Sequence, residues 1–164
     1  MVNFSLEGKV ALVTGGSYGI GFAIASAYAE AGATICFNGI HPESVERGIA
    51  KYKEKGIDVH GYVCDVTDEE QVKKMIAQIN EEVGVIDILV NNAGIILRKP
   101  MLETEADEFR KVVDTDLNAP FIVSKAVLPG MIEKGHGKII NVCSMMSELG
   151  RETVSAYAAA KGGL

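Results

Sequence analysis

The chain has 164 residues, 48% of them apolar, with 16 Lys+Arg against 22 Asp+Glu and a net charge of −6. This length predicts one domain that buries about 70% of the surface that its unfolded chain exposes. The composition excludes a disordered chain and a basic surface for nucleic acid, and no apolar run approaches the roughly 20 residues that a membrane helix requires.

Five short segments rich in β-branched residues alternate with longer segments of helical periodicity. The short segments are apolar at nearly every position, which is typical of strands covered on both faces. They are Val10–Thr14, Thr34–Asn38, Val59–Val63, Ile86–Val90 and Lys138–Val142. The predicted helices are Gly21–Ala31, Glu43–Lys55, Glu69–Val83, Glu105–Lys134 with a break near Pro129, and a last helix from about Val154.

The boundaries of these helices carry their own signals. Asp68 stands where a helix N-cap belongs, and Gly32, Gly56 and Gly135 stand where helices would end. The repeated alternation predicts the α/β class, with a doubly wound parallel sheet of Rossmann type. Residues 1–164 are therefore expected to form one dinucleotide-binding domain.

A glycine-rich loop, Thr14-Gly15-Gly16-Ser17-Tyr18-Gly19-Ile20-Gly21, follows the first strand and opens the first helix. Glycines there let the backbone turn tightly and approach a pyrophosphate above the helix N-terminus. The alternative is a glycine-rich turn without a ligand. The candidate cofactor-binding residues are Gly15, Ser17, Tyr18, Gly19, Ile20 and Gly21.

The end of the second strand bears on the choice of cofactor. An acidic residue there would bind the ribose hydroxyls of NAD, but Asn38-Gly39-Ile40-His41 has no carboxylate, and no Arg or Lys to bind a 2′-phosphate. The expected cofactor is NADP or NAD, with a lean to NADP, and Gly39 is a candidate contact. After the third strand, Asp65 and Val66 are candidates to bind adenine, although Asp65 would equally serve as a helix cap.

Tyr157 and Lys161 lie four residues apart, on one face of the last predicted helix. A phenol keeps its proton to about pH 10, but an ammonium ~4 Å away supplies ~4 kcal/mol at an effective dielectric near 20, enough to make it a proton acceptor. The spacing alone is more typical of an exposed helix without a function. Ser144 and Asn91-Asn92-Ala93-Gly94 follow the fifth and fourth strands, at the sheet edge where ligands bind.

These motifs together resemble the short-chain dehydrogenase/reductase family: Thr-Gly-xxx-Gly-x-Gly at 14–21, Asn-Asn-Ala-Gly at 91–94, Ser144 thirteen residues before Tyr157, and Tyr-xxx-Lys at 157–161. The resemblance implies an NAD(P)-dependent oxidoreductase with Asn92, Ala93 and Gly94 near the cofactor. It implies that Tyr157 exchanges the proton, Ser144 steadies the substrate oxygen and Lys161 holds the nicotinamide ribose. It also implies a homo-oligomer, either a dimer or a tetramer.

One position departs from the family. Asp116 stands where the family usually carries a catalytic Asn, so it is a candidate catalytic residue that adds a negative charge. Asn118 would face the other side of the helix.

The segments 118–121 and 144–153 are similar to the gluconate 5-dehydrogenases of this family, which interconvert D-gluconate and 5-ketogluconate. A sugar acid needs a partner for its carboxylate, and Arg98 and Arg151 lie in loops near the expected site. Met145, next to Met146, either lines the bottom of the site or only packs against other residues. Ser144 and Tyr157 are the remaining candidates for substrate contact. No metal is expected, because the three histidines show no ligand spacing. Three widely spaced cysteines favour a reduced, cytoplasmic protein.

Members of this family continue past the Tyr-xxx-Lys motif, so the sequence predicts a shortened chain that lacks the family's C-terminal strands and exposes its fifth strand. Two alternatives to an enzyme follow: a non-catalytic dinucleotide-binding module, or a fragment that assembles through its bared edge strand or last helix.

Overall fold

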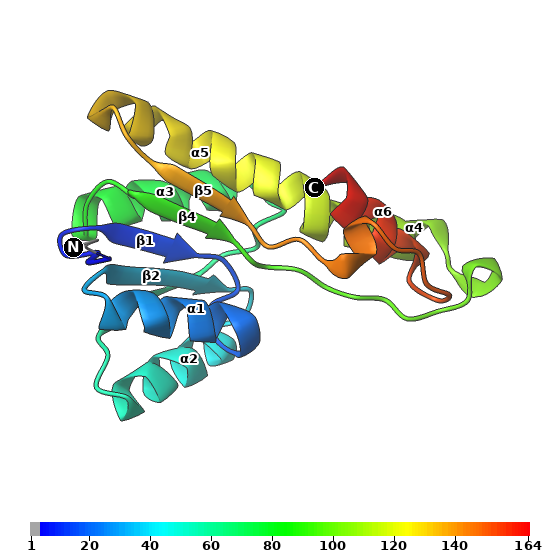
Figure 1. The fold of residues 1–164 in the computed structure, drawn as a ribbon, viewed down its shortest axis with the longest axis horizontal. Helices are drawn as coiled ribbons and strands as arrows, with labels where there is room; N and C mark the ends of the chain where they lie inside the picture. Colours follow the sequence, from blue (N-terminus) through cyan, green and yellow to red (C-terminus); the bar gives the residue numbers. More distant parts are fainter. Residues whose placement is uncertain (1–3) are drawn as a thin grey trace.

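The computed structural model describes residues 4–164, in which strands and helices alternate along the chain (Figure 1). The strands are β1 (Val10–Val13), β2 (Thr34–Gly39), β3 (Val59–Val63), β4 (Ile88–Asn91) and β5 (Lys138–Asn141). The α-helices are α1 (Gly19–Glu30), α2 (Pro42–Glu54), α3 (Glu69–Glu82), α4 (Ala106–Val113), α5 (Ala119–Lys134) and α6 (Ser155–Gly163). Three short segments complete them: the 3-10 turns η1 (Met101–Glu103) and η3 (Met145–Ser147), and the π-helical η2 (Asp114–Asn118).

All five strands are parallel and lie in the order β3-β2-β1-β4-β5. Successive residues of β1 divide the core between two layers: Leu12 packs with residues of α3 and α5, whereas Ala11 and Val13 pack with residues of α1 and α2. Figure 1 shows these two helix pairs on opposite faces of the sheet. The predicted doubly wound parallel sheet is confirmed, and its order reverses beside β1, where such sheets bind ligands.

The expectation that every strand is covered on both faces is wrong for the edges of the sheet. All four residues of β5 are exposed, and only Tyr62 is buried in β3. Within residues 4–164, each of these strands pairs with a single neighbour. The expected exposure of the fifth strand is therefore confirmed.

The predicted break near Pro129 is also wrong. Helix α5 runs through Pro129 without interruption, because proline keeps a helical φ and removes only one hydrogen bond. Burial of Val123, Val127 and Met131 on the same helix favours its continuation. The irregularity lies earlier, in η2, where a π-helical turn directs Asp116 inward and buries it completely.

The predicted helix boundaries are confirmed at both kinds of terminus. The carboxylate of Asp68 accepts hydrogen bonds from the backbone N–H groups of Glu70 and Gln71, so Asp68 caps α3. Gly135 is the C-cap of α5 in the left-handed region, with φ of 71°. A residue with a Cβ would be strained there.

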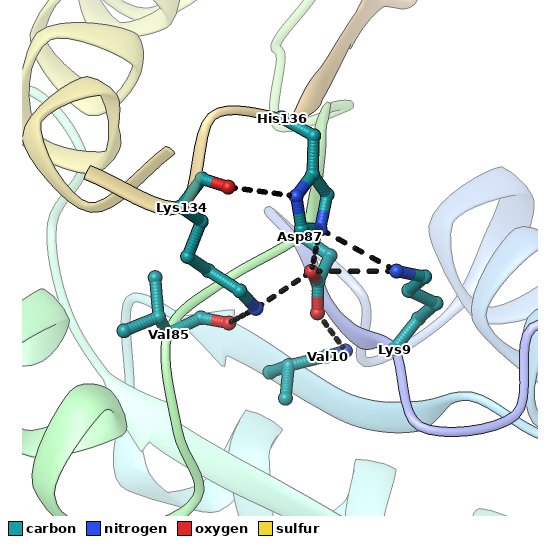
Figure 2. Close-up of polar contacts among 6 residues, drawn as sticks. All are labelled: Lys9, Val10, Val85, Asp87, Lys134 and His136. Atoms are coloured by element: carbon teal, nitrogen blue, oxygen red, sulfur yellow. Dashed lines mark hydrogen bonds and ion pairs between the residues drawn. The ribbon is translucent and has the colours of Figure 1, made fainter. Parts of the chain in front are cut away.

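Asp87 is at the centre of a cluster of polar contacts at the end of the sheet where the strands begin (Figure 2). Its carboxylate accepts hydrogen bonds from Val10 N at 2.9 Å, Lys134 Nζ at 2.7 Å and His136 Nε2 at 3.0 Å. Burial raises the pKa of the Asp87 carboxyl, but these hydrogen bonds outweigh burial and hold its pKa below the ordinary value. This polar cluster fixes β1, β4 and the approach to β5 relative to one another, at the opposite end of the strands from the candidate site.

Candidate functional site

The glycine loop lies so close to its neighbours that side chains would not fit. A Cβ on Gly16 would lie 2.7 Å from the Cβ of Phe37, and a Cβ on Gly21 would lie 2.5 Å from Asn92 Nδ2. Gly15 has φ of 63°, and its Cβ would lie 3.1 Å from the Cα of Ala93. The glycines therefore let the loop pass directly over the ends of β2 and β4.

The segment after β4 holds this loop from one side. Thr14 Oγ1 accepts hydrogen bonds from the backbone N–H groups of Asn92 and Ala93, both at 3.0 Å. The side-chain amide of Asn92 donates to Thr14 O at 2.8 Å. The sequence placed Asn92 near the cofactor, and the structure gives it a second task, fixing the loop against the sheet.

Two further side chains, those of Asn38 and Tyr52, hold the glycine loop, and neither contact was predicted from the sequence. Asn38 Oδ1 accepts a hydrogen bond from Gly15 N at 3.2 Å, and its amide donates to Cys64 O at 2.9 Å. The hydroxyl of Tyr52, a buried residue of α2, donates to Gly16 O at 2.7 Å. Nothing in the spacing of Tyr52 signals this contact, because it depends on how α2 packs against the loop.

A cavity of about 900 Å³ opens above the loop, at the upper end of the range for small-molecule sites. Eleven of the twelve residues that the sequence predicted from the glycine loop and the strand ends line it: Gly15, Ser17, Tyr18, Gly19, Ile20, Gly39, Asp65, Val66, Asn92, Ala93 and Gly94. The twelfth, Gly21, is buried behind the loop. The cavity wall also includes residues that were not predicted: Asn38, Ile40, His41, Ser44, Cys64, Thr67, Ile95, Asp107, Arg110, Lys111, Asp114 and Thr115.

Asp65 was predicted either to bind adenine or to cap the helix that follows it. Asp68 caps α3, so the capping alternative for Asp65 is wrong. The carboxylate of Asp65 instead accepts hydrogen bonds from Thr67 N at 2.9 Å and Thr67 Oγ1 at 2.7 Å. This local turn holds Asp65 at the cavity wall.

Tyr157 and Lys161 lie together on α6, with Lys161 Nζ 5.7 Å from the centroid of the Tyr157 ring. Lys161 is buried, and its ammonium donates to Val142 O at 2.9 Å. Its backbone carbonyl accepts a hydrogen bond from Ser147 Oγ at 2.9 Å. The lysine is therefore fixed at both ends, beside a half-buried tyrosine.

Asp116 connects this pair to the cavity. Its Oδ2 lies 3.5 Å from Lys161 Nζ, and its Oδ1 accepts a hydrogen bond from Ile95 N at 2.8 Å. Ile95 and Gly94 both line the cavity, and a Cβ on Gly94 would lie 2.8 Å from Asp116 Oδ2. Burial raises the pKa of Asp116 above its ordinary value, against the opposing effects of the Ile95 amide and Lys161.

Ser144 follows β5 as predicted, and it caps η3. Its Oγ accepts a hydrogen bond from Met146 N at 3.1 Å. Ser144, Tyr157 and Lys161 are not among the residues that line the cavity. They form a second group on α6 and at the start of η3, which Ser147 and Lys161 hold together and which Asp116 connects to Ile95 of the cavity wall.

The two candidate arginines lie in exposed positions of loops that touch each other. The backbone N–H of Lys99, next to Arg98, donates to Thr153 O at 2.8 Å, and Thr153 is two residues from Arg151. Thr153 has φ of 69°, the only non-glycine residue with positive φ among residues 4–164. Such strain in a β-branched residue is commonest at functional sites. Met145 is 70% exposed within residues 4–164, so the described part of the chain does not bury it.

Comparison with known proteins identifies the family. Residues 9–164 match the model of the short chain dehydrogenase family. The chain belongs to this family. Short-chain dehydrogenases of known structure superpose closely on it: a 2-keto-3-deoxy-D-gluconate dehydrogenase from Streptococcus agalactiae is 73% identical, with a TM-score of 0.84 over 99% of this chain and 61% of that one.

Two further short-chain dehydrogenases carry related names. A 2-dehydro-3-deoxy-D-gluconate 5-dehydrogenase from Formosa agariphila is 53% identical over 98% of this chain and 61% of its own length. A gluconate 5-dehydrogenase from Burkholderia cenocepacia, solved with NADP and tartrate, is 42% identical, with a TM-score of 0.91 over 98% of this chain and 63% of that one. The chain thus spans less than two thirds of the length of these relatives.

Within residues 4–164, no helix is both long enough and apolar enough to cross a membrane.

Proposed function

We propose that this chain supplies the cofactor site and the acid–base group of an NAD(P)-dependent oxidoreductase that acts at C5 of a D-gluconate-type sugar acid. One observation carries the proposal. Asp116 connects a glycine-lined cavity of about 900 Å³ to the Tyr157–Lys161 pair: it accepts a hydrogen bond from Ile95 of the cavity wall and lies 3.5 Å from Lys161 Nζ.

The cavity residues fit a dinucleotide. The first N–H groups of α1 have no partner within their helix, and Tyr18, its N-cap, makes no side-chain hydrogen bond to them. Those N–H groups can therefore bind a pyrophosphate, which the glycines allow to approach. His41 and Ser44 line the wall after β2, where no carboxylate would repel a 2′-phosphate, and this favours NADP. When bound, the nicotinamide supplies the hydride acceptor.

The residues of the second group have the donors and acceptors that the reaction needs. Tyr157 accepts the proton of the substrate hydroxyl as the same carbon loses its hydride, so an alcohol becomes a ketone. Ser144 Oγ accepts from Met146 N and keeps its own hydrogen to donate to the substrate oxygen. The ammonium of Lys161 has three N–H donors. One donates to Val142 O, and Asp116 Oδ2 lies 3.5 Å away without a hydrogen bond, so a donor is left for a ribose hydroxyl.

Arg98 and Arg151 are proposed to bind the substrate carboxylate. The hydrogen bond between Lys99 and Thr153 brings their two loops together after β4 and before α6. A pair of guanidinium groups on one side of the site would fix which end of a sugar acid faces Tyr157. The names of the relatives support this substrate class.

The proposal predicts that the protein that carries this chain reduces NADP⁺ in the presence of D-gluconate or 2-keto-3-deoxy-D-gluconate. The reaction is followed at the nicotinamide absorbance band, with NAD⁺ as the alternative cofactor and a simple alcohol as the control substrate. Calorimetric cofactor binding without turnover of any sugar acid would contradict the catalytic part and favour a dinucleotide-binding module. A protein that binds neither dinucleotide would contradict the whole proposal.

A further inference from the structure

Asp116 is the feature of the site that the proposed chemistry does not by itself require. It lies in the π-helical turn η2, is fully buried, and has Oδ1 engaged by Ile95 N at 2.8 Å. Its other oxygen, Oδ2, makes no hydrogen bond and lies 3.5 Å from Lys161 Nζ. The π turn therefore places a carboxylate beside the ammonium that faces Tyr157.

We propose that Asp116 sets the pH range of the reaction by offsetting the charge of Lys161 beside Tyr157. This inference rests on the proposed role of Tyr157 as the proton acceptor. Asp116 is a positioning residue rather than a catalytic one, because no surface of its side chain is exposed to meet substrate or cofactor.

The sign of the effect follows from electrostatics. A positive charge near a phenol favours its ionised form, and a negative charge favours its neutral form. Asp116 Oδ2 lies 3.5 Å from Lys161 Nζ, and Nζ lies 5.7 Å from the centroid of the Tyr157 ring, so the carboxylate oxygen is at most about 9 Å from that centroid. In a medium of effective dielectric near 20, a charge ~9 Å away changes a midpoint by about one pH unit. Removal of the Asp116 charge should therefore lower the midpoint measured for Tyr157 by about one pH unit.

The other charged groups around α6 have partners of their own. Three elements pack against α6, namely α4, η2 and η3. Arg110 of α4 pairs with Asp107, Glu108 pairs with Lys99, and exposed Asp114 of η2 accepts a hydrogen bond from Asn118. Lys111 of α4 lines the cavity, and η3 has no titratable side chain. Asp116 is the one carboxylate within 4 Å of Lys161 in the described part of the chain.

The test replaces Asp116 with Asn, which keeps an acceptor for Ile95 N and removes the charge. Two readouts are compared in the protein that carries this chain: the pH dependence of kcat/KM, and the NMR titration of ¹³Cζ-labelled tyrosine without cofactor, with Tyr157→Phe assigning the resonance. Both midpoints should fall by about one pH unit. Asp58→Asn, an exposed residue before β3, is the matched control and should change neither.

A second variant, Asp116→Ser, removes the charge with a different side chain and should shift both midpoints in the same direction. Unchanged or raised midpoints in folded Asp116→Asn and Asp116→Ser would overturn the inference. The NMR arm separates this failure from failure of the proposed function: a lowered Tyr157 midpoint in a protein that oxidises no sugar acid would support the role of Asp116 and contradict the activity.

Discussion

Replacing Tyr157 with Phe should lower kcat for sugar-acid oxidation by about 10³-fold, within the range that general acid–base catalysis contributes. The substitution removes the hydroxyl that is proposed to take the substrate proton and keeps the ring beside Lys161. Cofactor affinity should change little, because the cavity lining does not include Tyr157. Steady-state kinetics and calorimetric titration of NADP⁺ measure the two quantities separately.

Tyr28→Phe is the matched control for this substitution. Tyr28 is a partly buried residue of α1 that packs against the core layer between the sheet and α1 and α2. Figure 1 shows α1 apart from α6. Its variant loses the same hydroxyl and should keep the kcat of the unmodified protein. A Tyr157→Phe protein that retained full activity would refute the assigned proton transfer.

Replacing Asp87 with Ala should lower the free energy of unfolding by about 2–3 kcal/mol, because removing one partner of a buried, charged hydrogen-bond cluster leaves the others unpaired. The side chain of Asp87 is 3% exposed, and its loss would leave Val10 N and the Lys134 ammonium without their acceptor (Figure 2). Lys134 is about one third exposed, so water recovers part of its hydration. Equilibrium urea unfolding measures the change, with Asp58→Ala as the control.

The same cluster predicts how stability depends on pH. The pKa of Asp87 is lower in the folded state than the ordinary value near 4 of an unfolded chain. Its contribution to stability is therefore fully present above about pH 4 and is lost as the pH falls through the lowered pKa. Asp87→Asn keeps an acceptor for Val10 N and should show a shallower loss of stability in acid. An acid limb as steep as that of the unmodified protein would contradict this account.

The sequence predicted the fold well where a local signal determines the structure. The alternation of apolar segments correctly predicted all five strands. Asp68 and Gly135 were correctly predicted to lie at helix ends. The errors arose where tertiary packing decides. Pro129 is tolerated because one face of α5, with Val123, Val127 and Met131, is buried on both sides of it. The π turn at Asp114–Asn118 has no residue pattern that distinguishes it from an ordinary helix. The exposure of β5 follows from its place at the edge.

The candidate site was predictable to a similar extent. Contacts formed by consecutive residues, as in the glycine loop and the Asn-Asn-Ala-Gly segment, follow from motif and position. Other contacts depend on how helices pack, and the spacing of residues in the sequence does not predict them. Examples are the hydrogen bond from Tyr52 to Gly16 and the α4 residues that line the cavity. The replacement at Asp116 was visible in the sequence, but its burial and its pairing with Lys161 required the three-dimensional arrangement.

The central claim is that the glycine-lined cavity and the Tyr157–Lys161 pair form one site. A crystal structure of the protein with NADP⁺ tests it most directly. The pyrophosphate should lie over the first turn of α1, and the nicotinamide should lie beside Tyr157. A substrate carbon should then fit at about 3–3.5 Å from C4 of the nicotinamide. A dinucleotide bound in the cavity with its nicotinamide end directed away from α6 would contradict the account.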